Sequence, residues 1–100
     1  MTRKEKLAVI NTVRCFVSLE LREIDADKLL IREISSLMDT KYIGRITENT
    51  LKTVIKLVRL ARKEAEKMPV TDRVLEAITE IQQWGMWFCG KFNMAYSLMD

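Results

Sequence analysis

The last third of the chain carries an apolar seam with the period of an α-helix. Its members follow one another at alternating spacings of four and three: Val74, Ile78, Ile81, Gly85, Phe88, Phe92, Ala95 and Met99. This spacing places them along one side of a helix that packs against partner helices. From Trp84 onward a second set adds apolar groups in nearly every other direction: Trp84, Met86, Trp87, Cys89, Met94, Tyr96 and Leu98. We therefore expect a C-terminal helix that is buried on several sides.

Residues that break helices are rare in the chain. The 100 residues include one proline and three glycines, while apolar residues make up 48% and charged residues 31% of the total. This composition is typical of a globular protein, and the length fits a single domain over residues 1–100. Long helices with short connections should result. We predict an all-α fold, a compact bundle of four principal helices.

Capping residues indicate where these helices begin. Candidate N-caps precede each predicted helix: Thr2, with Glu5 at the spacing of a capping box, then Asp25 or Asp27, then Thr47, and finally Thr71. The predicted helices are Arg3 to Ile24, Asp27 to Asp39, Glu48 to Lys67 and Asp72 to Leu98. The last of them is predicted to be the longest and the most apolar.

Gly85 and Gly90 interrupt the most apolar part of the C-terminal helix. Glycine inside a helix is less favourable than alanine by about 1 kcal/mol, so the missing side chains should serve a purpose. Either another helix approaches closely at these two positions, or the helix breaks there and the following residues fold back. The sequence leaves both alternatives open.

Large apolar side chains in the C-terminal helix outnumber those that one helix of a bundle can turn inward. Tryptophan, tyrosine and methionine are also enriched in the cores of protein interfaces. We therefore predict a protein interface formed by Trp84, Trp87, Phe88, Phe92 and Met94. The alternative is that these side chains fill the core of a monomer. The favoured function is a non-enzymatic binding module, an adaptor or inhibitor, that acts as a homodimer or on a partner protein.

Basic residues concentrate on the third predicted helix. Residues 41–68 hold eight basic and three acidic residues, whereas residues 25–40 and 69–100 each carry a net charge of −2. The basic residues Lys52, Lys56, Arg59 and Lys63 share one helical face, and Arg62 lies beside them. A second hypothesis is therefore a nucleic-acid-binding accessory protein whose phosphate contacts are Lys52, Lys56, Arg59, Arg62 and Lys63. The alternative is a solvated outer face.

A helix-turn-helix reading of residues 25–56 fits poorly. The predicted loop from Thr40 to Thr47 is longer than the usual turn of about three or four residues. In addition, Asp39 and Thr50 fall where buried apolar contacts would be needed. We therefore do not expect this unit to read a DNA sequence.

Residues for catalysis or metal binding are scarce. The chain has no histidine, which removes the commonest general base and the commonest zinc ligand. Asp25 and Asp27 are candidate caps, and Glu76 and Glu80 lie one turn apart on a predicted exposed face. We expect no enzyme activity, no cofactor, no metal site and no small-molecule substrate.

The two cysteines lie far apart in the sequence and form no CxxC pair. We expect Cys15 and Cys89 to be buried free thiols, because both lie among apolar residues of predicted helices.

No stretch approaches the roughly 18 uncharged apolar residues of a membrane span, and the residues after Arg3 and Lys4 lack the pattern of a signal peptide. A cytoplasmic protein without membrane contacts is expected.

Overall fold

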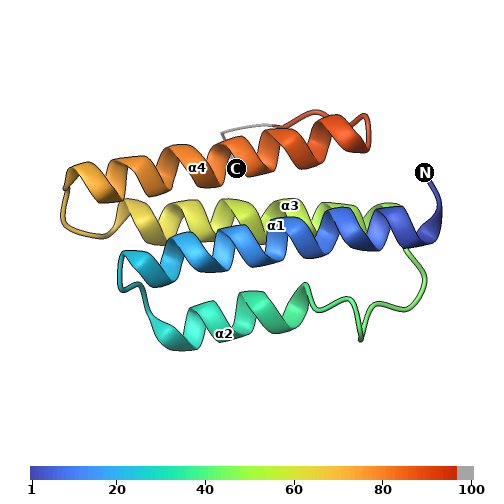
Figure 1. Ribbon diagram of the computed structural model, residues 1–100, viewed down its shortest axis with the longest axis horizontal. Coiled ribbons are helices and arrows are strands. Elements are labelled where there is room, and N and C mark those ends of the chain that lie inside the picture. Colours follow the sequence, from blue (N-terminus) through green and yellow to red (C-terminus); the bar gives the residue numbers. More distant parts are fainter. Residues whose placement is uncertain (97–100) are drawn as a thin grey trace.

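Four α-helices follow one another in residues 1–96, the part of the chain that the computed structural model describes. They are α1 (Arg3–Glu23), α2 (Lys28–Leu37), α3 (Glu48–Glu66) and α4 (Asp72–Lys91). No strand occurs in this part of the chain, so the predicted all-α bundle is confirmed. Helix α1 packs against the other three helices, and α3 also packs against α4 (Figure 1).

The predicted N-caps are confirmed at the start of all four helices. The Thr2 hydroxyl accepts a hydrogen bond from the Glu5 backbone amide, and the Glu5 carboxylate accepts one from the Thr2 amide, which completes the capping box. The other capping side chains, which accept from backbone amides of the first turn, are Asp27, Thr47 and Thr71. Asp25, the alternative cap of α2, instead has a φ of 56° in the connection that precedes the helix.

The C-terminal helix ends earlier than predicted. Helix α4 stops at Lys91 instead of Leu98, and with 20 residues it is shorter than α1, which has 21. Asn93 has a φ of 53°, a left-handed conformation that asparagine tolerates better than most residues. The Met94 amide donates to the Cys89 carbonyl at 2.8 Å, as in a Schellman motif. The predicted helical positions Ser97 and Leu98, and the seam residue Met99, lie outside the described residues.

Residues 92–96 fold back along α4 towards Gly85. A Cβ atom at position 85 would lie 2.8 Å from two ring carbons of Tyr96, whereas a Cβ atom at Gly90 would have nothing within 4 Å. Both glycines remain helical, so the helix does not break at either of them. Neither alternative from the sequence holds as stated: the group close to Gly85 is the Tyr96 side chain of the folded-back residues and not another helix, and nothing lies close to Gly90.

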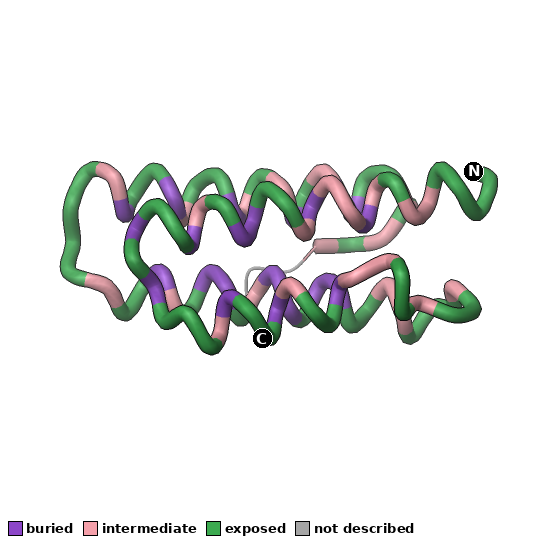
Figure 2. The backbone as a smooth tube through the Cα atoms, turned by 60° about the horizontal axis from the view of Figure 1, so that its bottom comes forward, coloured by how far each residue is buried: buried purple, intermediate pink, exposed green. Residues whose placement is uncertain are grey.

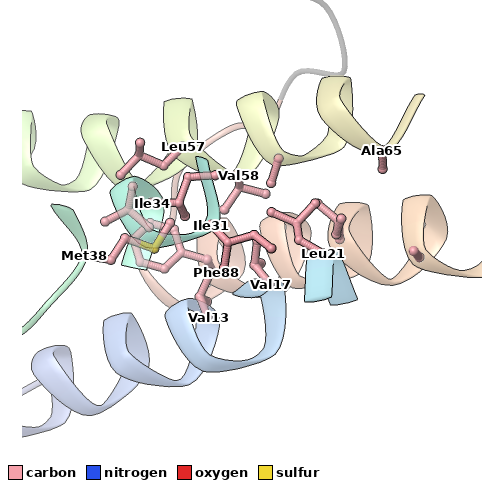
Figure 3. Packing of buried hydrophobic residues seen from close by; sticks show 14 of the residues in the cluster. Val13, Val17, Leu21, Ile31, Ile34, Met38, Leu57, Val58, Ala65 and Phe88 are labelled. Atoms are coloured by element: carbon pink, nitrogen blue, oxygen red, sulfur yellow. The ribbon is translucent and has the colours of Figure 1, made fainter. Parts of the chain in front are cut away.

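The core lies where the inner sides of the helices meet (Figure 2). Phe88 is the largest of the fully buried side chains, and Figure 3 shows it among residues from all four helices. Its fully buried companions include Val13, Val17, Leu21, Ile34, Met38 and Val58. In the C-terminal helix the period of three and four identified the inner side correctly as far as Phe88, because Val74, Ile81, Gly85 and Phe88 are buried.

Polar contacts hold α2 against α1. The Arg14 guanidinium donates from Nε to the Ser35 carbonyl at 2.7 Å, and its terminal nitrogen lies 3.6 Å from the Asp39 carboxylate. Arg14 is half-buried, so these bonds replace water that the guanidinium loses in the bundle. The contacts fix the end of α2 beside the middle of α1.

The two cysteines differ in exposure. Both are free thiols, as predicted, and Cys89 is buried, but Cys15 is exposed, so the prediction of burial was wrong for Cys15. Successive helical residues are about 100° apart, which places Cys15 on the far side of α1 from the fully buried Val17.

None of the helices in residues 1–96 is both long and apolar enough to span a membrane.

Candidate functional site

Helices α1 and α4 run antiparallel and are clamped together at one end by an ion-pair cluster. The Arg73 guanidinium on α4 lies 2.9 Å from the Glu20 carboxylate on α1 and also contacts the Glu23 carboxylate. Hydrogen bonds to these two carboxylates raise the pKa of Arg73 above its ordinary value. The clamp joins the end of α1 to the start of α4.

Three aromatic rings lie next to one another farther along the same pair of helices. Phe16 of α1 stacks on Trp84 of α4, with ring centroids 4.5 Å apart and ring planes at 12°. Trp87 meets Trp84 edge to face, with centroids 5.3 Å apart. Phe16 is 43% exposed, and both tryptophans are half-buried. We call Phe16, Trp84 and Trp87 the aromatic surface.

A hollow with a polar rim opens beside the aromatic surface. It measures about 310 Å³ and is lined by Thr12, Glu80, Gln83, Trp84 and Trp87. The Lys91 ammonium lies 5.5 Å from the centroid of the Trp87 ring, a cation–π distance. The apolar rings therefore lie beside side chains that can donate or accept hydrogen bonds. Protein interfaces combine an apolar centre with a polar rim in the same way.

The five residues predicted for the protein interface do not form one surface. Trp84 and Trp87 belong to the aromatic surface, but Phe88 is fully buried and Phe92 is half-buried beside it, with ring centroids 4.8 Å apart. Met94 lines a different hollow together with residues of α3. Phe88 therefore belongs to the core and Phe92 packs against it, so the interface hypothesis is left with the two tryptophans.

Phe16 is the member of the aromatic surface that the sequence did not reveal. The helical period places Phe16 next to Val17 among the apolar residues of α1. Adjacent helical residues point about 100° apart, so Phe16 lies at the edge of this apolar stripe, on the side of α4, while Val17 faces the core. The edge position was visible in the sequence, but the stacking on Trp84 depends on how α1 and α4 pack.

The predicted basic stripe on α3 is only partly on the surface. Lys52, Lys56 and Lys63 are exposed, and Arg59 is half-buried with its guanidinium 5.8 Å from the centroid of the Tyr96 ring. Arg62 is only 5% exposed, with Nε 3.4 Å from a Glu66 carboxylate oxygen. It lies one turn after the fully buried Val58 and shares the inner side of α3. As the side chain lies, Arg62 does not reach an external phosphate.

A second hollow combines this stripe with the folded-back residues. It measures about 260 Å³ and is lined by Lys52, Ile55, Lys56, Arg59, Met94 and Ala95. Tyr96 follows directly and is half-buried, and its burial raises the pKa of its phenol, although Arg62 and Arg59 oppose the shift.

Within residues 1–96, no cluster of three or more cysteine, aspartate or glutamate side chains is arranged to hold a metal ion.

Comparisons with protein families, curated proteins and solved structures find no match to this chain.

Proposed function

We propose that the chain is a non-enzymatic protein-binding module that uses the aromatic surface of α1 and α4 and binds a second copy of itself. The observation that carries this proposal is the stacking of Phe16 on Trp84 while 43% of Phe16 stays exposed. Adaptor and inhibitor roles both fit such a module.

The aromatic surface has the properties of an interface centre. Stacked rings offer a rigid apolar area at low cost in side-chain entropy, and a tryptophan at the centre of an interface commonly contributes about 2 kcal/mol or more. The hollow beside Trp84 and Trp87 offers space for an apolar side chain of the bound protein. Leu19, one turn after Phe16 and also 43% exposed, extends the apolar area along α1.

The charges along α4 favour a second copy as the partner. Lys91 follows Trp84 by seven residues and Glu76 precedes it by eight, which corresponds to about 10 Å and about 12 Å along the helix. A two-fold axis at Trp84 would therefore set Lys91 of one copy opposite Glu76 of the other. Such an isologous arrangement forms the same ion pair twice around paired aromatic surfaces.

Sedimentation velocity over a range of concentrations tests the proposal. The unchanged chain should sediment as a dimer, and Phe16→Ala should shift it to the monomer while helicity and cooperative unfolding are retained. Leu29→Ala is the matched control, because Leu29 is 72% exposed on α2, away from the aromatic surface. This control should remain dimeric.

A chain that stays monomeric at about 1 mM has a self-association free energy weaker than about −4 kcal/mol, and the homodimer would then be rejected. In that case the protein-binding function would require a different partner. It would survive only if nuclease-treated lysate yielded a protein that binds the unchanged chain and the Leu29→Ala control but not Phe16→Ala.

A further inference from the structure

The basic and the acidic residues of the bundle gather on different sides of α4. The basic residues lie on the side of α3, and the acidic residues lie on the side of α1. Between Glu48 and Glu64, helix α3 carries basic residues and no acidic residue, and residues 92–96 carry no charge. The groove between α1 and α4 is instead lined by one cation, Arg73, and by five carboxylates: Glu20, Glu23, Asp72, Glu76 and Glu80. A polyanion is therefore attracted to the α3 side and repelled from the groove of α1 and α4.

The basic hollow of about 260 Å³ lies on the α3 side. Lys56 and Arg59 supply positive charge from successive turns of α3, and Ile55 adds an apolar surface. Lys52 contributes less, because its ammonium lies 3.4 Å from the Glu48 carboxylate. The opposite wall is formed by Met94 and Ala95, which reach α3 because the chain folds back after Asn93. The hollow therefore depends on two segments that are far apart in the sequence.

Tyr96 holds both segments in place. Its ring fills the space left by the missing side chain of Gly85, and the Arg59 guanidinium lies 5.8 Å from the ring centroid. A cation over a tyrosine ring is attracted by the π-electrons and loses freedom of movement. Arg59 is thus held beside the hollow, where its positive charge lies close to an anion that enters the hollow.

We propose that the basic hollow binds a phosphate of a nucleic-acid backbone through Lys56 and Arg59, and that the folded-back residues 92–96 form part of the site. The exposed cations Lys52, Lys56 and Lys63 continue along α3 over about 16 Å, which suits a row of phosphates better than the single phosphate of a modified peptide. The hollow presents no aromatic face for base stacking, so binding should depend little on sequence.

Fluorescence anisotropy with a labelled mixed-sequence DNA duplex, measured over a series of salt concentrations, tests the site. Lys56→Gln and Arg59→Gln should each reduce the slope of log affinity against log salt by about 0.9. Lys28→Gln is the matched control: it removes one exposed positive charge from α2, away from the hollow. Its slope should equal that of the unchanged chain.

Tyr96→Ala tests the contribution of the folded-back residues. It changes no charge, yet it should weaken duplex binding at fixed salt, because Arg59 loses the ring over which it is held and the second wall of the hollow is released. Unchanged affinity in Tyr96→Ala would show that residues 92–96 are not part of the site.

Three further outcomes would overturn the phosphate site itself. The first is the absence of duplex binding at low salt. The second is a loss of slope in Lys28→Gln equal to that in Lys56→Gln, which would mean a general attraction by net charge. The third is binding of a phosphorylated peptide without binding of DNA or RNA. None of these outcomes bears on the aromatic surface, since the basic hollow and the aromatic surface share no residue.

Discussion

The ring of Tyr96 occupies the space that a side chain at position 85 would need. A Cβ atom on Gly85 would lie 2.8 Å from Cε2 and Cζ of Tyr96, closer than real Cβ contacts allow. Glycine therefore suits position 85 inside α4, despite its poor helix propensity, because the Tyr96 ring packs directly on the helix backbone there.

Substitutions at the two helical glycines should differ in their effect on stability. Gly90→Ala has free space around the new methyl group and should raise the free energy of unfolding by up to about 1 kcal/mol. Gly85→Ala should gain less or lose stability, because the methyl group displaces Tyr96. In a Tyr96→Ala background, Gly85→Ala should raise the free energy of unfolding by about as much as Gly90→Ala does. Urea unfolding of the four variants measures this coupling, and additive effects at positions 85 and 96 would contradict the contact.

Burial raises the pKa of the Tyr96 phenol above the ordinary tyrosine value of about 10. In a Tyr42→Phe variant, in which Tyr96 is the remaining tyrosine, tyrosinate absorbance should therefore develop above that pH in the folded chain. In denaturant it should develop at the ordinary value. Between the two pKa values only the unfolded chain has lost the proton, so the stability due to this group is complete below about pH 10 and decreases as the pH rises. Equal midpoints would mean that Tyr96 is solvated.

The two thiols should react at very different rates. Cys15 is exposed, whereas burial raises the pKa of the Cys89 thiol and lowers the fraction of reactive thiolate. A thiol-specific disulfide reagent should thus modify one cysteine rapidly in the folded chain and both in denaturant. Cys15→Ser should abolish the rapid phase. A rapid phase that persists in Cys15→Ser would show that Cys89 is accessible.

Asn93 should be replaceable by glycine but not by alanine. With a φ of 53° it ends α4 in the left-handed region, where alanine is less favourable by about 1 kcal/mol. Asn93→Gly should leave thermal stability equal or higher, and Asn93→Ala should lower it. Equal melting temperatures for the two variants would argue against the left-handed turn.

The sequence predicted the helices well wherever side chains of the same helix decide the outcome. All four N-caps were recognised, because a cap requires a particular side chain within three residues of the amide that it satisfies. The end of α4 was missed because Phe92 continues the apolar period past the helix and packs on Phe88 from the C-cap position. Periodicity does not distinguish a further helical turn from a chain that reverses and buries the same residues.

The candidate surfaces could be predicted only in part. Trp84 and Trp87 were identified from their number and spacing, but Phe16 joins them through tertiary packing. Arg62 lies beside the predicted basic face that includes Lys63, yet the structure places it on the buried side of α3. Met94 reaches the basic hollow only because the chain folds back after Asn93. Each of these placements depends on contacts between residues that are distant in the sequence.

Charge reversal across the proposed dimer axis tests the central claim most directly, because it requires both self-association and the pairing of Lys91 with Glu76 of the second copy. Each ion pair between Lys91 and Glu76 of the second copy would stabilise the dimer by about 0.5 kcal/mol, because both residues are exposed. The two-fold arrangement forms this pair twice, and reversing one charge turns both attractions into repulsions. In sedimentation equilibrium, Lys91→Glu and Glu76→Lys should each weaken the dimer by roughly tenfold or more, and the double variant should restore it. A double variant that associates no more tightly than either single variant, or an unchanged chain that is monomeric throughout, would contradict the account.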